Sequence, residues 1–261
     1  YDVFRNRLVF PILDRRGDVI GFGGRTLGTD PAKYMNTPQT EAFDKGSVLY
    51  GLHVAIEPIR AARSVVIVEG YMDVIAAHQN SFNNVVAAMG TAITPGQVRL
   101  LRGISKRIVI ALDADTAGIA ATRRSLELVS SSLTNQSGPE LDSLVQYENR
   151  SEADIFVAAL PDGKDPDDVI RDSPAKWDML INKAIPLADY LFKAVTSDLD
   201  YSSPLARTEA MNKAVSIIHG ITQPAVRALY IGRLALLLRV PEDEIERQMR
   251  RQPLQGKISS V

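Results

Sequence analysis

The chain has 261 residues, of which 45% are hydrophobic, and its 30 basic residues nearly balance its 31 acidic ones. This composition supports globular cores, and the lack of any long apolar run excludes a membrane-spanning segment, so we expect a cytoplasmic protein with no membrane partner. The absence of cysteine excludes disulfides and thiolate zinc sites, so any bound metal needs oxygen ligands, which favours Mg²⁺ or Mn²⁺ over zinc.

Residues 1–62 are expected to form an incomplete, β-rich N-terminal segment. Residues 8–13 and 19–24 are predicted strands joined by a charged turn, whereas residues 29–46 lack periodicity and are predicted to form a loop. The glycines at 21–24 do not follow the dinucleotide-binding fingerprint, and no Walker A sequence occurs in the chain, which excludes a P-loop NTPase. The first residue is Tyr1 and not Met, which suggests a piece of a longer protein.

Residues 63–172 are expected to form an α/β domain. Strands are predicted at 65–68, 85–89, 108–112 and 154–160, and helices at 72–79, 94–102 and 117–129. The strand at 65–68 is a continuous apolar run, as expected for a strand that is buried on both faces. Strands that alternate with helices indicate a parallel sheet flanked by helices.

Residues 173–261 are expected to form a helical bundle and the start of a linker. Pro204, Pro224 and Pro241 lie where helices are expected to begin. Two apolar helix faces are predicted, one of Met211, Ala214, Val215 and Ile218 and the other of Val226, Tyr230, Leu234 and Leu237.

Acidic residues follow the predicted parallel strands. Glu69 comes directly after the first strand, and Asp113 and Asp115 come directly after the third. The carboxyl ends of parallel strands meet at one edge of a sheet, where binding sites form. Clustered carboxylates beside a buried sheet need a counter-ion, so these three residues are the candidate catalytic and metal-binding residues.

Three further acids have an alternative structural role. Asp165 and Asp167 follow the fourth strand and are a candidate second arm of the metal site, although a plain turn would also explain them. Asp73 lies in the first turn of the predicted helix at 72–79, where an acid commonly caps the helix, so it is the weakest candidate.

A basic and polar set lies in the N-terminal segment. Phosphates of a nucleic-acid strand or of a nucleotide would need such side chains, although each one alone is usually a solvated surface group. The candidates for binding nucleic acid or nucleotide are Arg5, Arg7, Arg25, Lys33, Tyr34, Asn36 and Lys45.

Three segments resemble the TOPRIM motifs of the bacterial DnaG-type primases. They are residues 68–74 (VEGYMDV), 112–118 (LDADTAG) and 160–167 (LPDGKDPD), and residues 5–12, 21–25, 31–38 and 43–52 resemble the same family. The resemblance extends to about residue 195. Ala114 stands where the family more often has glycine.

The resemblance implies a TOPRIM fold and template-directed synthesis of short RNA primers from ribonucleoside triphosphates on single-stranded DNA. Two or more divalent ions would take part, one held by Glu69, Asp113 and Asp115 and another by Asp165 and Asp167. The zinc-binding domain, the front of the polymerase core and the helicase-binding end are expected to be missing. The replicative helicase would then be contacted only through a region that is absent from this sequence.

Two other readings stay open. A TOPRIM sheet also serves nucleases and topoisomerases, where Glu69 would transfer a proton at a strand break. The chain could instead be a non-catalytic fragment that binds nucleic acid or partners through its helical end.

Overall fold

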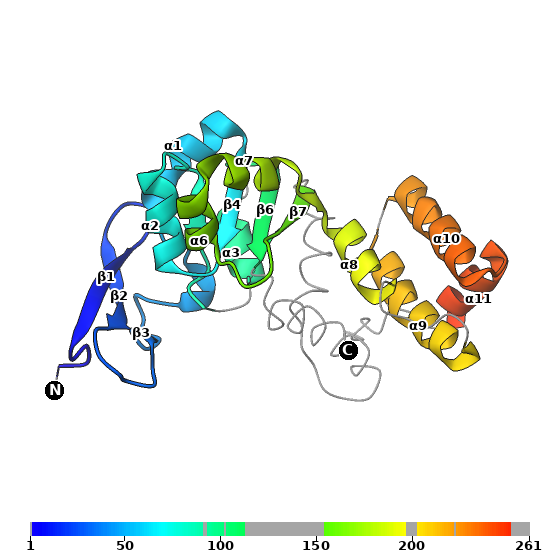
Figure 1. The fold of residues 1–261 in the computed structure, drawn as a ribbon, viewed down its shortest axis with the longest axis horizontal. Helices are drawn as coiled ribbons and strands as arrows, with labels where there is room; N and C mark the ends of the chain where they lie inside the picture. The colour runs from blue at the N-terminus through cyan, green and yellow to red at the C-terminus, as the bar shows by residue number, and fades with distance from the viewer. Residues whose placement is uncertain are drawn as a thin grey trace, which may run out of the picture. The chain divides into compact units, whose positions relative to one another are not determined.

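The structure is a computed structural model that describes residues 2–90, 93–101, 103–112, 154–196, 203–221 and 223–251. These residues fall into two compact units, one made of residues 2–112 and 154–184 and the other of residues 185–251 (Figure 1). Along this described part of the chain, no helix has both the length and the apolar character to pass through a membrane.

The first unit begins with a small antiparallel sheet. Strands β1 (Arg7–Leu13) and β2 (Val19–Thr26) form the predicted hairpin, whose turn is held by the Asp14 carboxylate, which accepts the Arg16 N–H at 2.8 Å. Strand β3 (Tyr34–Asn36) pairs with β2 inside the residues that were predicted to form a loop. Backbone pairing with β2 creates this three-residue strand, and apolar alternation gives no sign of it.

A helix follows that the sequence analysis missed. After the 3-10 turn η1 (Lys45–Ser47), helix α1 (Leu52–Ala62) buries Leu52, Ala55 and Ile59. These apolar residues recur at helical spacing, so the pattern was readable within the segment that was predicted to be β-rich. Just before α1, Tyr50 forms an isolated antiparallel bridge with Ala87.

The predicted parallel sheet is confirmed. Among the described residues, its strands β4 (Ser64–Val68), β5 (Val85–Ala87), β6 (Arg107–Leu112) and β7 (Asp154–Ala159) are parallel and lie in the order β5-β4-β6-β7. Helix α2 (Tyr71–Gln79) joins β4 to β5, and α3 (Pro95–Leu100) lies between β5 and β6. The helix predicted at 117–129 lies outside the described residues.

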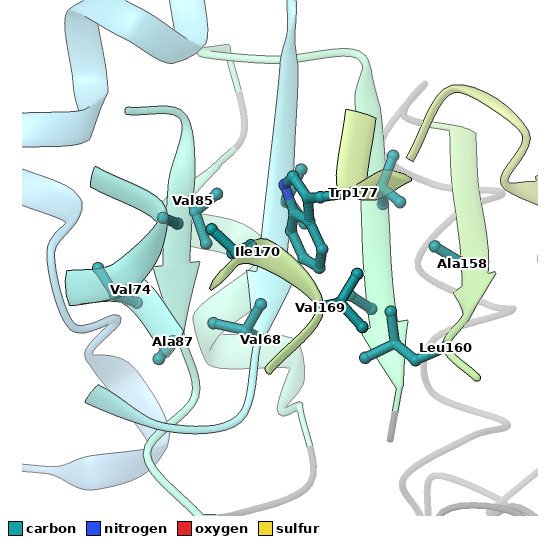
Figure 2. Packing of buried hydrophobic residues seen from close by; sticks show 13 residues of the cluster. Val68, Val74, Val85, Ala87, Ala158, Leu160, Val169, Ile170 and Trp177 are labelled. Atoms are coloured by element: carbon teal, nitrogen blue, oxygen red, sulfur yellow. The ribbon is translucent and has the colours of Figure 1, made fainter. Parts of the chain in front are cut away.

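Two helices after β7 pack on the same face of the sheet as α2. Helix α6 (Pro166–Asp172) buries Val169 and Ile170, and α7 (Pro174–Asn182) buries Trp177, which is 1% exposed. Figure 2 shows these side chains gathered with Val68 of β4 and Val74 of α2. This packing places α7 with the sheet, in the compact unit that runs to residue 184.

The second unit is helical, as predicted. Its elements are β8 (Ile185–Pro186), α8 (Leu187–Thr196), α9 (Pro204–Gly220), α10 (Pro224–Leu238) and α11 (Glu242–Arg251). On α9, Ala214, Val215 and Ile218 are buried as expected. On α10 the expected face is wrong at its end, because Leu237 is 37% exposed and Leu238 is 1% exposed. Since positions 234–238 are all apolar, periodicity cannot choose between neighbouring leucines.

Candidate functional site

Glu69 lies at the carboxyl edge of the parallel sheet. It follows the four buried residues 65–68 of β4 and is itself solvent-exposed. The next residue, Gly70, has an extended backbone and forms the N-cap of α2, while the Glu69 carbonyl accepts the Gly90 N–H at 3.2 Å. The strand end therefore holds the backbone of Glu69 in place and leaves its carboxylate at the surface.

Asp73 caps α2 and also reaches a second element. Its Oδ2 accepts the Gly70 N–H at 2.9 Å, and its Oδ1 accepts the Asp167 N–H from α6 at 3.3 Å. The residue is only 8% exposed. The capping role that the sequence left open is present, and it comes with a contact across 94 residues of sequence that no local pattern reveals.

Asp165 and Asp167 lie at the start of α6. Asp165 is the N-cap, and its Oδ1 accepts the Asp168 N–H at 2.7 Å. The Asp167 carboxylate lies 2.5 Å from the Arg171 guanidinium. Burial raises the pKa of Asp167, and the neighbouring Asp165 and Asp168 raise it further, while Arg171 acts in the opposite direction. The contact with Asp73 brings this acidic turn next to the end of β4.

Asp113 and Asp115 lie outside the described residues. Strand β6, which ends at Leu112, lies between β4 and β7 and runs parallel to both. Within the described part, no group of three or more His, Cys, Asp or Glu side chains has the arrangement of a metal site. The candidate metal ligands at this edge are nevertheless all carboxylates, from Glu69, Asp165 and Asp167. Carboxylate oxygens suit a hard divalent cation such as Mg²⁺ or Mn²⁺.

Tyr71 joins the N-terminal sheet to this edge. Its ring stacks on Phe10 of β1 with 5.2 Å between centroids, and it meets Tyr50 edge-on at 5.1 Å. A Cβ at Gly23 of β2 would lie 2.5 Å from the Tyr71 ring, so the glycine-rich strand is a packing feature. Burial raises the pKa of Tyr71 to about 12.

Tyr34, Arg25 and Lys33 form a basic and aromatic cluster on this sheet. The Arg25 guanidinium carbon and the Lys33 ammonium each lie 5.9 Å from the centre of the Tyr34 ring, which itself lies 6.0 Å from Tyr71. Tyr34 is 43% exposed. Burial raises the pKa of Tyr34, Arg25 lowers it, and the charges of Asp73, Asp165 and Asp167 also raise it.

The backbone of Lys45 is held by Gln97, which was not among the predicted site residues. The buried Gln97 amide nitrogen donates to the carbonyls of Lys45 and Val48 at 3.1 Å and of Ala88 at 3.3 Å. Burial lowers the pKa of Lys45. Thr94 and Gln97 form a capping box, which the Thr-x-x-Gln spacing predicts. The hydrogen bond from Gln97 to the Lys45 carbonyl depends on tertiary structure and has no such local signal.

The three other predicted contacts differ in environment. Arg7 is buried, pairs with Asp30 at 2.6 Å and donates to the Ala32 carbonyl at 2.8 Å, so it braces the loop that precedes Lys33. Arg5 is exposed. Asn36 lies on β3, and its amide nitrogen is 3.5 Å from the Met89 carbonyl.

Three family models match the chain. The model for the N-terminal domain of the DNA primase catalytic core matches residues 1–56, a Toprim-like model matches residues 66–141, and the model for the DnaB-helicase binding domain of primase matches residues 188–243.

The third match corrects one expectation. The helicase-binding end was expected to be missing, and this is wrong, since residues 188–243 match the model that is described as helicase-binding. Apolar periodicity shows only that helices bury one face, and it does not show what their other faces bind.

Relatives and solved structures agree with these matches. A DNA primase of Clostridium acetobutylicum is 37% identical over 239 residues, which cover 90% of this chain and 36% of that protein. The crystal structure of a DNA primase domain from Pseudomonas aeruginosa has 32% identity and a TM-score of 0.79, covering 96% of this chain and 74% of that one. A structure of the DnaG primase catalytic domain bound to single-stranded DNA has 32% identity and a TM-score of 0.77, covering 94% and 73%.

Proposed function

Since the chain belongs to the DnaG family of bacterial DNA primases, we propose that it forms the metal-binding part of an RNA polymerase that makes short RNA primers on single-stranded DNA. The observation that carries this proposal is the acidic edge of the parallel sheet, where Glu69 and the turn at Asp165–Asp167 are joined through Asp73. The chain spans about a third of the length of the Clostridium relative, so the activity is proposed for the whole protein of which this chain is a part.

The acids at this edge would hold the divalent ions that the family generally uses. In this proposal Glu69, Asp113 and Asp115 hold one Mg²⁺ or Mn²⁺, and Asp165 and Asp167 contribute to a second site. Bound there, such ions would lower the pKa of the attacking 3′-hydroxyl and neutralise charge on the triphosphate. The protein's own contribution is to fix these carboxylates on strand ends and on a helix N-terminus.

The cationic and aromatic cluster would face the nucleic acid or the incoming nucleotide. Arg25, Lys33 and Tyr34 combine two cations with a half-exposed ring, which suits phosphate contact and stacking. Further contacts would come from Arg5 just before β1, from Asn36 on β3 and from Lys45 in η1. Arg7 would act indirectly, because its buried side chain pairs with the half-exposed Asp30 and holds the loop that leads to Lys33.

The helical unit would link this activity to the replication fork. Residues 188–243 match the helicase-binding family model, so we propose that this unit contacts the replicative helicase. Primer synthesis would place the whole protein in the bacterial cytoplasm, with the template, ribonucleoside triphosphates and the growing primer as its other partners.

A primer-synthesis assay on the whole protein tests the proposal. Asp113→Asn and Asp115→Asn should each abolish ribonucleotide incorporation on single-stranded DNA, while Asp178→Asn on the exposed side of α7 should keep wild-type yield. Normal primer yield from either site variant would remove these residues from the metal site. Mg²⁺-dependent cutting of labelled DNA in the absence of ribonucleotides would instead support the nuclease reading.

A further inference from the structure

Two acidic turns from distant parts of the chain meet at one buried carboxylate. The first turn is Glu69–Gly70 at the end of β4, and the second is Asp165–Asp167 at the start of α6. The carboxylate between them belongs to Asp73, which is 8% exposed. One of its oxygens accepts the Gly70 N–H at 2.9 Å and the other accepts the Asp167 N–H at 3.3 Å.

This arrangement differs from an ordinary helix cap. A first-turn acid normally accepts an N–H of its own helix terminus, and the bond to Gly70 satisfies that role alone. The bond to Asp167 adds a donor from another helix. Burying a carboxylate is costly unless hydrogen bonds compensate, and both of these N–H groups contribute to that compensation.

The core beneath the two turns keeps α2 and α6 together. Val74 of α2 and Val169 and Ile170 of α6 belong to one buried cluster with Val68, the residue before Glu69 (Figure 2). Apolar packing fixes the helices side by side but is non-directional. The directional hydrogen bonds of Asp73 set the relative position of the two backbones next to the candidate metal ligands.

We propose that Asp73 is a positioning residue, which fixes the spacing between Glu69 and the Asp165–Asp167 turn and thereby the geometry of the metal site. This inference rests on the proposed function. In this inference Asp73 does not bind the metal ion itself but holds the backbones that carry the metal ligands. Groups that orient metal ligands in this way typically change metal affinity by about 10- to 100-fold when they are replaced.

Asp73→Asn tests the inference, because the amide keeps the shape of the side chain but replaces one acceptor oxygen by an NH₂ group. One of the two backbone N–H groups then loses its acceptor. We expect Mn²⁺ affinity, measured calorimetrically on this chain, to fall by about 10- to 100-fold. We also expect faster amide hydrogen exchange at Gly70 or Asp167, followed by NMR. Asp178→Asn, a matched change on α7, should alter neither quantity.

The outcomes separate the alternative roles of Asp73. Weaker Mn²⁺ binding with unchanged exchange at Gly70 and Asp167 would make Asp73 a ligand, and faster exchange with unchanged Mn²⁺ binding would make it a simple cap; either result overturns the inference. If Asp73→Asn does not fold, Asp73→Glu, which keeps the charge but moves it by one methylene, should show the same paired changes. Failure of the wild-type chain to bind Mn²⁺ would contradict the proposed function, and the exchange data would still decide whether Asp73 joins the two turns.

Discussion

Gly23 shows how a single residue ties the N-terminal sheet to the acidic edge. Because glycine has no side chain, the Tyr71 ring can lie against β2. Tyr71 is the first residue of α2 and lies two residues after Glu69. The stacking of Tyr71 on Phe10 and its edge contact with Tyr50 make it the centre of an aromatic group. The placement of Glu69 thus depends on an aromatic contact with a strand more than forty residues earlier in the sequence.

Gly23→Ala should destabilise the first unit. The added Cβ would lie 2.5 Å from the Tyr71 ring, and overpacking of this kind costs about 1–3 kcal/mol. The urea midpoint of unfolding measures the loss. Gly46→Ala is the matched control, because a Cβ there would meet its nearest neighbour at an ordinary 3.5 Å. Equal midpoints for Gly23→Ala and the wild type would contradict the proposed packing.

His53 on α1 should make folding sensitive to mild acid. Burial lowers the pKa of His53, the nearby His78 lowers it further, and Asp14 opposes both. The folded protein therefore takes up a proton less readily than the unfolded chain, whose histidine pKa is 6.5. Stability should fall as pH drops below that value, and His53→Gln should make this dependence shallower. Urea midpoints at pH 7.5 and 5.5 give the slope, and identical slopes for the two proteins would refute the assignment.

At the scale of elements, short connections are held by side chains buried beneath them. Helix α3 has only six residues, yet its Gln97 donates to the carbonyl of the first residue of η1, to the carbonyl just after η1 and to one carbonyl after β5. A further bond, from the Thr94 hydroxyl to the Gly46 carbonyl at 2.5 Å, holds the same turn. Lys45 is thereby presented from a fixed backbone.

Gln97→Leu should release the turn that carries Lys45. Loss of the amide donor deprives buried carbonyls of a partner, which costs about 1–3 kcal/mol. We expect lower thermal stability and faster tryptic cleavage after Lys45. Gln79→Leu at the exposed end of α2 should change neither. A cleavage rate at Lys45 equal to that of the wild type would show that the turn does not need Gln97.

Sequence patterns predicted the elements that carry their own signal. The parallel strands are apolar runs, and the helix starts at Pro204 and Pro224 have local markers, so both were found. Helix α6 was missed, although Asp165 at its N-cap and Pro166 at its first position are local markers of a helix start, because its seven residues are too few to show apolar periodicity. The roles of Asp73 and Gln97 depend on partners that are distant in the sequence, which no local pattern specifies.

At the scale of the whole molecule, the acidic edge should couple metal binding to folding. A cation that binds only the folded state stabilises it by RT ln(1 + [L]/Kd), about 2.7 kcal/mol at one hundred times Kd. Mn²⁺ should therefore raise the melting temperature of the wild-type chain, and EDTA should reverse the rise. Asp113→Asn should show a much smaller rise. A rise of the same size in Asp113→Asn would exclude this residue as a ligand.

The buried position of Trp177 gives the chain a built-in optical reporter. It is the only tryptophan in the sequence, it lies in the core of the first unit, and it meets Phe82 edge-on at 6.4 Å. Its fluorescence therefore follows the melting of the first unit, whereas far-ultraviolet circular dichroism also records the helices of the second unit. Transitions that coincide in the two signals would show cooperative unfolding of the whole chain, and separated transitions would show that each unit melts independently.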